Sequence, residues 1–205
     1  MVPAAGRGER FGGDKLLAQW HDRALLGHVL LKLGGARAAG LLGATVVVHR
    51  PGDDAVRALA GEYRCHAEAM RVNDGDLSMS LRTGIDSVKS RGSADSQQAI
   101  LICLGDQPMI RVDVIKALIE TWARGGAMAV RPIYREAPDQ PGHPFLVDKS
   151  LWHLADEMRG DSGFSPVLAR HRINVRTIPV AGTNPDVDTL DDLKLLNHEP
   201  RAATA

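Results

Sequence analysis

A glycine-rich segment near the start of the sequence has the residue types that bind phosphate groups. Four glycines fall within residues 6–13, so the backbone can approach a ligand closely and point its free N–H groups at phosphate oxygens. Arg10 and Lys15 add two cations that can meet several phosphates. The segment has neither the Gly-Lys-Ser/Thr ending of a Walker A loop nor the GxGxxG of a dinucleotide-binding loop. Taken alone, it fits a phosphate-binding loop or a flexible surface turn.

A carboxylate follows the most apolar segment of the chain. Residues 99–104 are apolar throughout and predict a strand buried on both faces, after which Gly105 and Asp106 follow. In a parallel sheet, ligands bind beyond the carboxyl ends of the strands, where the glycine-rich segment would also lie. A carboxylate and a polyphosphate repel each other unless a divalent cation lies between them, so Asp106 suggests Mg²⁺. The alternative is that Asp106 is only the first polar residue of a turn.

Four aspartates near the end of the sequence divide into two pairs. Asp191 and Asp192 follow Thr189, which predicts a helix that Thr189 caps and whose dipole favours acidic residues in the first turn. Asp186 and Asp188 stand before this helix, and capping does not account for them. One of these two carboxylates can complete the metal site.

The elements that must position these residues alternate between strand and helix. Over the first ~130 residues this alternation predicts right-handed βαβ crossovers and a mostly parallel sheet with helices on both faces. The extended segments 127–134 and 142–147, joined by a loop with Pro and Asp, predict a small antiparallel insertion. Other strands are expected at 44–49, 99–104 and 174–179, and helices at 25–39, from Asp54, and at 80–88, 111–124, 151–158, 165–170 and 190–197. The first strand, residues 1–4, is expected to be truncated or to continue upstream of the given sequence.

Composition indicates one globular α/β domain. The chain has 205 residues, of which 44% are apolar, and its 25 basic and 25 acidic residues balance. This balance argues against nucleic acid or a membrane surface as partner, because both need excess Lys and Arg. The two cysteines lack CxxC spacing, and no apolar segment reaches the ~18 residues of a membrane span, so we expect a cytoplasmic protein. We expect a single Rossmann-like domain over residues 1–198 and a loose tail over 199–205.

Five segments together resemble the MobA-like nucleotidyltransferases, and within them the branch with molybdenum cofactor cytidylyltransferases and related molybdoenzyme-maturation proteins. These segments are AAGRGERFGGDK (4–15), LGDQP (104–108), PGHP (141–144), GDSG (160–163) and DVDT (186–189) with Asp192-Leu193. Their order and spacing cover essentially the whole chain, which is much more specific than any one motif.

The resemblance implies a nucleotide-binding fold and Mg²⁺-dependent transfer of a nucleotidyl group. It implies that Arg10, Lys15 and Asp106 are the catalytic residues, with Asp106 as the principal metal ligand and Asp188 as the second. His143 and Asp161 would lie on the acceptor side. The implied nucleotide-binding residues are Ala5, Gly6, Gly8, Arg10, Lys15, Ser78, Ser80 and Asp106.

The residues at 76–81 depart from the family pattern. Asp76-Leu77 replace the usual Gly-Met pair, while Ser78 and Ser80 remain. Asp76 brings a negative charge near the expected base or ribose, which leaves the choice of nucleotide open. CTP is the favoured donor and GTP the alternative, and the expected acceptor is a phosphorylated molecule of the molybdopterin type. A molybdoenzyme is the candidate client protein.

The proposed chemistry suits anionic reactants. An acceptor phosphate would attack the α-phosphorus of a nucleoside triphosphate and release pyrophosphate, so the catalyst must mainly position the reactants and offset their charge. Two other classes of function stay open. One is an oxidoreductase with a flavin or nicotinamide on the same fold, and the other is a non-catalytic carrier of the molybdenum cofactor.

Overall fold

The strands of the computed structural model, which describes residues 1–73, 75–91 and 97–196, form two sheets and a hairpin. The first sheet has the order β1-β4-β5, the second the order β6-β8-β7-β9, and β2 pairs with β3. The strands are β1 (Val2–Pro3), β2 (Gln19–Trp20), β3 (Arg23–Ala24), β4 (Val46–His49), β5 (His66–Ala69), β6 (Ala99–Ile102), β7 (Ala129–Tyr134), β8 (Phe145–Asp148) and β9 (Val175–Val180).

Strand directions confirm the expected α/β fold with a parallel sheet and an antiparallel insertion. β1, β4 and β5 pair in parallel, and β7 pairs in parallel with β9. β8 runs antiparallel to both β6 and β7. Met1 joins the two sheets, because its nitrogen donates to the Leu101 carbonyl (2.6 Å) and its carbonyl accepts from the Cys103 N–H (3.0 Å). β1 therefore lies beside β6, and the ends of both strands meet at one edge.

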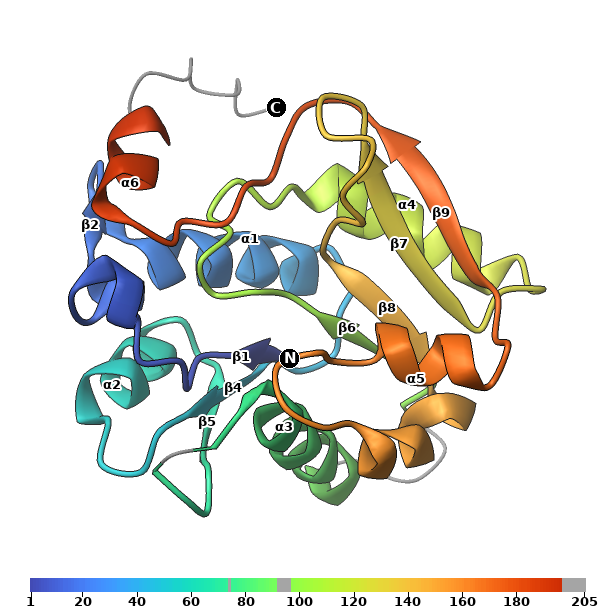
Figure 1. Cartoon of the computed structure of the whole chain (residues 1–205), viewed down its shortest axis with the longest axis horizontal. Helices are drawn as coiled ribbons and strands as arrows, with labels where there is room; N and C mark the ends of the chain where they lie inside the picture. The colour runs from blue at the N-terminus through green and yellow to red at the C-terminus, as the bar shows by residue number, and fades with distance from the viewer. Residues whose placement is uncertain (74, 92–96, 197–205) are drawn as a thin grey trace.

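Helices cover both faces of the strands (Figure 1). One apolar cluster packs α3, η3 and α5 against one face, and a second packs α1, α2 and α4 against the other. The α-helices are α1 (Leu25–Ala38), α2 (Asp54–Glu62), α3 (Leu77–Arg91), α4 (Val112–Ala123), α5 (Ser165–Arg170) and α6 (Leu190–Leu196). The 3₁₀ segments are η1 (Glu9–Phe11), η2 (Lys15–Leu17) and η3 (Lys149–Glu157).

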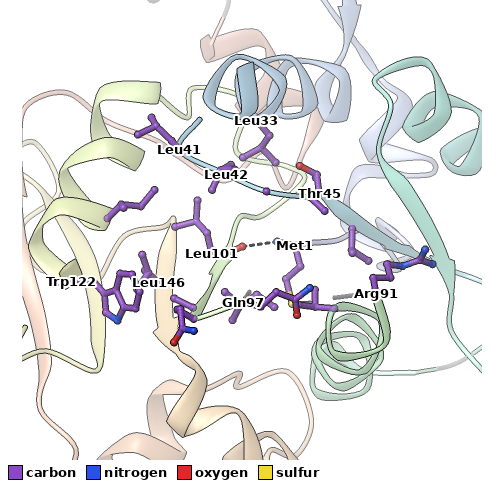
Figure 2. Close-up of a pocket in the computed structure, with 18 residues that line it drawn as sticks. Met1, Leu33, Leu41, Leu42, Thr45, Arg91, Gln97, Leu101, Trp122 and Leu146 are labelled. Carbon is purple, nitrogen blue, oxygen red and sulfur yellow. Dashed lines mark hydrogen bonds between the residues drawn. The ribbon is translucent and has the colours of Figure 1, made fainter. Parts of the chain in front are cut away.

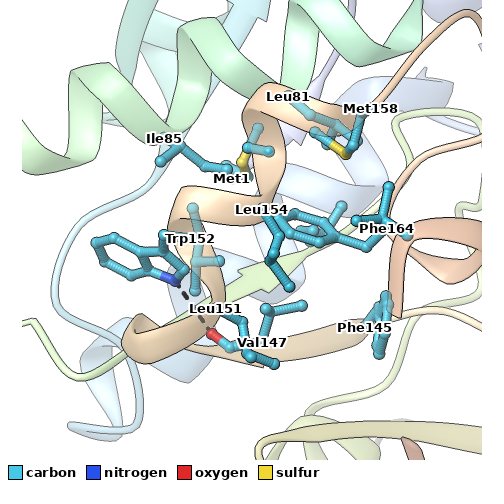
Figure 3. Packing of buried hydrophobic residues seen from close by; sticks show 14 of the residues in the cluster. Met1, Leu81, Ile85, Phe145, Val147, Leu151, Trp152, Leu154, Met158 and Phe164 are labelled. Atoms are coloured by element: carbon cyan, nitrogen blue, oxygen red, sulfur yellow. Dashed lines mark hydrogen bonds between the residues drawn. The ribbon is translucent and has the colours of Figure 1, made fainter. Parts of the chain in front are cut away.

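The core on the α3 side unites residues that are distant in sequence (Figure 3). Met1 and Ile85 of α3 pack in the same cluster as Trp152 of η3 and Phe164, and all four are buried. The indole N–H of Trp152 donates to the carbonyl of Val147 at 3.2 Å, so its one polar atom is satisfied inside the core. The segment after β8 is thereby fixed against α3, and the loop that follows it reaches the start of that helix.

Two expected elements differ in the structure, and one strand was not expected. α3 begins at Leu77 rather than Ser80, because Asp76 caps it by accepting hydrogen bonds from the Ser78 hydroxyl (2.6 Å) and the Met79 N–H (2.9 Å). The helix expected over 151–158 is a 3₁₀ segment. β5 was not predicted at all. The last residue of the helix expected over 190–197 and the tail expected over 199–205 lie outside the described residues.

Within the part of the chain that the structure describes, no helix is long and apolar enough to span a bilayer.

Candidate functional site

The glycine-rich segment folds back on itself after β1. Gly8 has a left-handed backbone (φ 62°), and its carbonyl accepts hydrogen bonds from the N–H groups of Phe11 and Gly12. A Cβ atom at position 8 would collide with the carbonyl oxygen of Gly13, so both the backbone angle and the space require glycine there. This tight turn brings Arg10 and Lys15 to the same pair of carboxylates.

Two cations of the glycine-rich segment meet two distant aspartates. The ammonium of Lys15 lies 2.7 Å from Asp106 Oδ2 and 2.9 Å from Asp188 Oδ1. The guanidinium of Arg10 lies 2.9 Å from Asp188 Oδ2. The structure therefore brings together the three predicted catalytic residues and both predicted metal ligands.

Asp188 reaches this point because the chain returns from β9 to the N-terminal half, where α6 lies beside β2 (Figure 1). The N–H of Val187 donates to the backbone carbonyl of Asp106 at 3.0 Å. Thr189 caps α6 as expected, since its hydroxyl oxygen accepts from the Asp192 N–H (3.2 Å). The Asp192 carboxylate accepts in return from the N–H groups of Asp188 and Thr189. Asp188 is thus held between a fixed turn and a fixed helix start.

These residues border a cleft of about 380 Å³ at the carboxyl ends of β1 and β6. Residues 3–6 and 8 line it, as do Asp76, Leu77 and Ser80 at the start of α3. The predicted site residues that line it are Ala5, Gly6, Gly8, Arg10, Lys15, Ser80, Asp106, Asp161 and Asp188.

The two predicted serines have different surroundings. The hydroxyl of Ser80 borders the cleft, is buried (the residue is 3% exposed), and has no hydrogen-bond partner among the described residues. A buried hydroxyl without a partner is costly, so Ser80 is a candidate to contact a molecule bound in the cleft. The Ser78 hydroxyl instead donates to Asp76 and accepts from Arg82, and Ser78 does not line the cleft.

The carboxylate of Asp76 accepts hydrogen bonds from the protein itself, although Asp76 lines the cleft. The hydrogen bond from the Ser78 hydroxyl, followed by the one from the Met79 N–H, lowers the pKa of Asp76 against the opposing effect of burial. The sequence suggests a free negative charge near a nucleotide base. In the structure a helix N–H group and a hydroxyl face this charge and partly offset it.

The two predicted acceptor-side residues lie in different places. Asp161 Oδ1 accepts from the Leu77 N–H (3.1 Å), so the 160–163 loop is fixed to the start of α3. His143 precedes a cis proline and is not among the residues that line the cleft. Its carbonyl accepts from the Tyr134 hydroxyl (2.8 Å), and burial followed by the charge of Arg131 lowers the pKa of its imidazole to about 4. His143 is consequently neutral at pH 7.

Three aspartates, Asp106, Asp186 and Asp188, make this end of the cleft an acidic centre, and the positive charge of Lys15 opposes them. Burial lowers the pKa of Lys15, but the charges and hydrogen bonds of Asp106 and Asp188 outweigh this, and the pKa lies above its ordinary value. Burial raises the pKa of Asp186, and the charges of Asp106 and Asp188 raise it further. The centre thus stabilises positive charge and disfavours more negative charge.

The donor set at this centre fits a hard divalent cation. Asp106 and Asp188 present carboxylate oxygens, which Mg²⁺ prefers, and both oxygens already face a positive charge, the ammonium of Lys15. Within the described ranges, no group of three or more His, Cys, Asp or Glu residues forms a complete metal cage. An ion held by two carboxylates plus substrate phosphates and water is how Mg²⁺ usually binds.

Sequence reasoning missed Gln107 and Asn184, which connect the cleft to the loop at 141–144. Gln107 Nε2 donates to Asp186 Oδ1 (2.9 Å), and Asn184 Nδ2 donates to Gln107 Oε1 (3.0 Å). Both residues lie beside motif aspartates in the sequence, but nothing in their spacing indicates that they meet.

A second cavity, of about 290 Å³, lies at the amino ends of the strands around Met1 (Figure 2). Its walls are mostly apolar side chains such as Leu33, Leu101 and Leu146. It contains none of the predicted site residues, so the candidate site is the cleft at the opposite ends of the strands.

The family model of the MobA-like NTP transferase domain matches residues 1–175. The chain belongs to this family. Members of this family are nucleotidyltransferases. The matched residues include both the glycine-rich segment and Asp106. No curated protein matches the chain significantly.

Solved structures similar to this MobA-like protein cover nearly its whole length. The crystal structure of Rv0371c from Mycobacterium tuberculosis H37Rv is 28% identical, with a TM-score of 0.79 over 97% of each chain. A manganese complex of Rv0371C from the same organism is 27% identical, with a TM-score of 0.74 over 95% of each chain. A CMP:2-keto-3-deoxy-manno-octonic acid synthetase complexed with CTP is 16% identical, with a TM-score of 0.73 over 95% of this chain and 94% of the other. This last likeness shows the fold alone.

Proposed function

We propose that this protein transfers a nucleotidyl group from a nucleoside triphosphate to a phosphorylated acceptor, with Mg²⁺ as cofactor and pyrophosphate as the second product. CTP is the proposed donor, with GTP as the variant, and the proposed acceptor is of the molybdopterin type. The observation that carries the proposal is the meeting of Lys15 with Asp106 and Asp188 in a cleft walled by the glycine-rich segment.

In this proposal the backbone of Gly6 and Gly8 contacts the triphosphate, while Arg10 and Lys15 offset its charge. An oxygen of the acceptor phosphate attacks the α-phosphorus, a new P–O bond forms, and the bond to the β-phosphate oxygen breaks as pyrophosphate leaves. Mg²⁺, held by Asp106 and Asp188, would supply further charge neutralisation. An ionised acceptor phosphate needs no general base, so positioning and charge account for catalysis.

Lys15 would change partners when the donor binds. Without ligand its ammonium neutralises Asp106 and Asp188. Once the triphosphate and its metal are present, the carboxylates have a divalent cation and Lys15 can turn to the phosphates. The metal offsets part of the charge of the triphosphate and takes the place of Lys15 at the carboxylates, which favours binding of the metal and the triphosphate together rather than of either alone.

The choice of CTP and of the acceptor rests on the resemblance of the 141–144 and 160–163 segments to the cytidylyltransferase branch. The CTP complex of the synthetase is compatible with a cytidine nucleotide on this fold. Ser80 supports a nucleotide in the cleft, because its buried hydroxyl has no hydrogen-bond partner in the part of the chain that the structure describes. A molybdoenzyme client and a cytoplasmic location belong to the same proposal.

Thermal unfolding with Mg²⁺ plus CTP, GTP, ATP or NADH, each separately, tests the donor. A ligand at ~100 times its Kd stabilises by about 2.7 kcal/mol, which raises Tm by roughly 5 to 11 °C for a domain of this size. We expect a Mg²⁺-dependent shift with CTP, followed by pyrophosphate release when a molybdopterin-type acceptor is added. A shift with GTP alone would change the donor, and one with NADH alone would favour the oxidoreductase. Acceptor binding without turnover would favour the carrier.

A further inference from the structure

The side-chain amide of Gln107 is enclosed between two residues of the segment that carries Asp188. Gln107 is 6% exposed and follows Asp106 directly. Its Nε2 donates to Asp186 Oδ1 at 2.9 Å, and its Oε1 accepts from Asn184 Nδ2 at 3.0 Å. Both ends of the amide are therefore used, one as donor and one as acceptor.

These two bonds form a bridge between the Asp106 turn and residues 184–188, which we call the closing segment. A third bond, from the Val187 N–H to the Asp106 carbonyl (3.0 Å), completes the bridge. Asp188 is the next residue, and its carboxylate faces the Lys15 ammonium together with Asp106. The placement of Asp188 relative to Asp106 is thus set on one side by the bridge and on the other by the cap of α6.

An amide at position 107 suits both native partners of the bridge. Asp186 presents an acceptor and Asn184 presents a donor, so a side chain between them must both donate and accept. Asn184 Nδ2 also donates to the His143 carbonyl at 3.3 Å, which extends the network to the 141–144 loop. Gln107 itself is not among the residues that line the cleft.

We propose that Gln107 is a positioning residue, whose amide holds the closing segment in register with Asp106 so that Asp106 and Asp188 act as one cation-binding pair. This inference rests on the proposed function for its catalytic readout. Beyond that function, it states that hydrogen bonds of Gln107, a residue that does not line the cleft, hold Asp188 in place relative to Asp106.

Four variants at positions 107 and 186 separate these hydrogen bonds from side-chain volume. Gln107→Met keeps the length of the side chain and removes both bonds. Gln107→Glu keeps the bond from Asn184 but sets a second carboxylate against Asp186. Asp186→Asn retains an acceptor oxygen for the Gln107 amide. The double variant Gln107→Glu/Asp186→Asn restores both bonds, since Asn at 186 donates to Glu at 107. Gln140→Met, at an exposed position, is the matched control.

Two readouts follow each variant: the Kd of Mn²⁺ alone, measured without nucleotide, and kcat and KM for CTP with the acceptor. Loss of residues that orient metal ligands typically costs roughly 10- to 100-fold in metal affinity or activity. We expect this loss for Gln107→Met and Gln107→Glu, recovery toward the native values in the double variant, and native values for Gln140→Met. Asp186→Asn measures separately the effect of losing the Asp186 charge beside the pair. The Tm of every variant, measured without metal, shows that it is folded at the assay temperature.

The rescue distinguishes positioning from a general structural role, because a merely destabilised core would not recover Mn²⁺ affinity when the polarity of one bond is reversed. A double variant that binds Mn²⁺ no better than Gln107→Glu would overturn the proposal. Native Mn²⁺ affinity in a folded Gln107→Met protein would do the same. If the native protein binds Mn²⁺ but transfers no nucleotide, the proposed function fails while the ranking of Mn²⁺ affinities still decides the role of Gln107.

Discussion

The ammonium of Lys15 lies 2.7 Å from the carboxylate of Asp106, 91 residues further along the chain. Both side chains are largely enclosed, at 14% and 20% exposure, so water screens this pair less than a surface ion pair. Asp188 shares the same ammonium at 2.9 Å. Lys15, which the sequence predicts to bind phosphate, therefore also offsets the negative charges of Asp106 and Asp188.

Replacing Asp106 tests the acidic pair directly. We expect Asp106→Asn to lower kcat by roughly 10² to 10³, the cost of removing one electrostatic contact to a developing charge. Lys15 keeps Asp188 as a partner, so the loss of its bond to the Asp106 carboxylate should cost about 1.5–3 kcal/mol of stability and the variant stays folded. Steady-state kinetics and thermal unfolding measure both effects. Asp86→Asn is the control, because Asp86 is an exposed aspartate on α3 whose partner is Lys89. Unchanged turnover, or an unfolded Asp106→Asn protein, would contradict the assignment.

Ser78 and Ser80, two residues apart on α3, should respond in opposite ways to truncation. Ser78→Ala removes a hydroxyl bonded to the Asp76 carboxylate, and a bond to a charged group contributes about 1.5–3 kcal/mol. We expect a lower Tm with little change in nucleotide KM. Ser80→Ala removes a buried hydroxyl with no partner in the described chain, so Tm should hold or rise.

The matching effect of Ser80→Ala appears in nucleotide binding. If a donor oxygen or nitrogen is the missing partner, KM for CTP should rise roughly 2- to 10-fold, the value of one neutral hydrogen bond. Comparison of the two variants in Tm and KM measures this directly. A Ser80→Ala protein with lower Tm and native KM would remove Ser80 from the nucleotide site.

Arg10 tests charge at the rim of the cleft. Its side chain is 76% exposed, so its ion pair with Asp188 adds little to stability, and Arg10→Met should leave Tm unchanged. If Arg10 meets the triphosphate, KM for CTP should rise about 10-fold or more, as for a lost charge-assisted hydrogen bond. Arg57→Met is the matched control, since Arg57 is similarly exposed and pairs with Asp54. Equal KM values for the two variants would place Arg10 outside the donor site.

Much of the fold could be predicted because its signals are local. The apolar runs that form β4 and β6 and the periodic segments that form α1 and α4 were all predicted within a few residues. β5 was missed because His66–Ala69 is a short edge strand with polar and half-exposed residues, and only its pairing with β4 makes it a strand. The start of α3 was missed because the capping role of Asp76 depends on the backbone that follows it.

The site was less predictable because its contacts are long-range. Strand ends and motif order indicated that Asp106 and the glycine-rich segment lie at one edge, and the structure places them there. The sequence does not indicate that Lys15 pairs with both aspartates, or that Gln107 joins Asp186 to Asn184, because these contacts require the closing segment to return from β9. The roles of these residues in catalysis stay predictions.

The pH dependence of stability should report on His143. Its pKa is about 4 in the folded protein and near 6.5 in the unfolded chain, so the unfolded chain binds more protons between these values. Stability therefore falls as pH falls from about 6.5 toward 4. His143→Gln does not titrate, and its unfolding free energy should decline less over this interval. Urea unfolding from pH 7 to pH 4 measures the slopes, and parallel curves for the two proteins would show that His143 is open to water.

The return of the chain from β9 to α6 has a consequence for biosynthesis. Domains form from the N-terminus onward as the ribosome releases the chain. The glycine-rich segment emerges before Asp106, and Asp188 with the Thr189–Asp192 cap emerges after both. Until then Lys15 has only one of its two carboxylates. A nascent chain halted before residue 184 would therefore have most of its core and Asp106 but not Asp188, so the two aspartates would come together only after residue 188 has emerged.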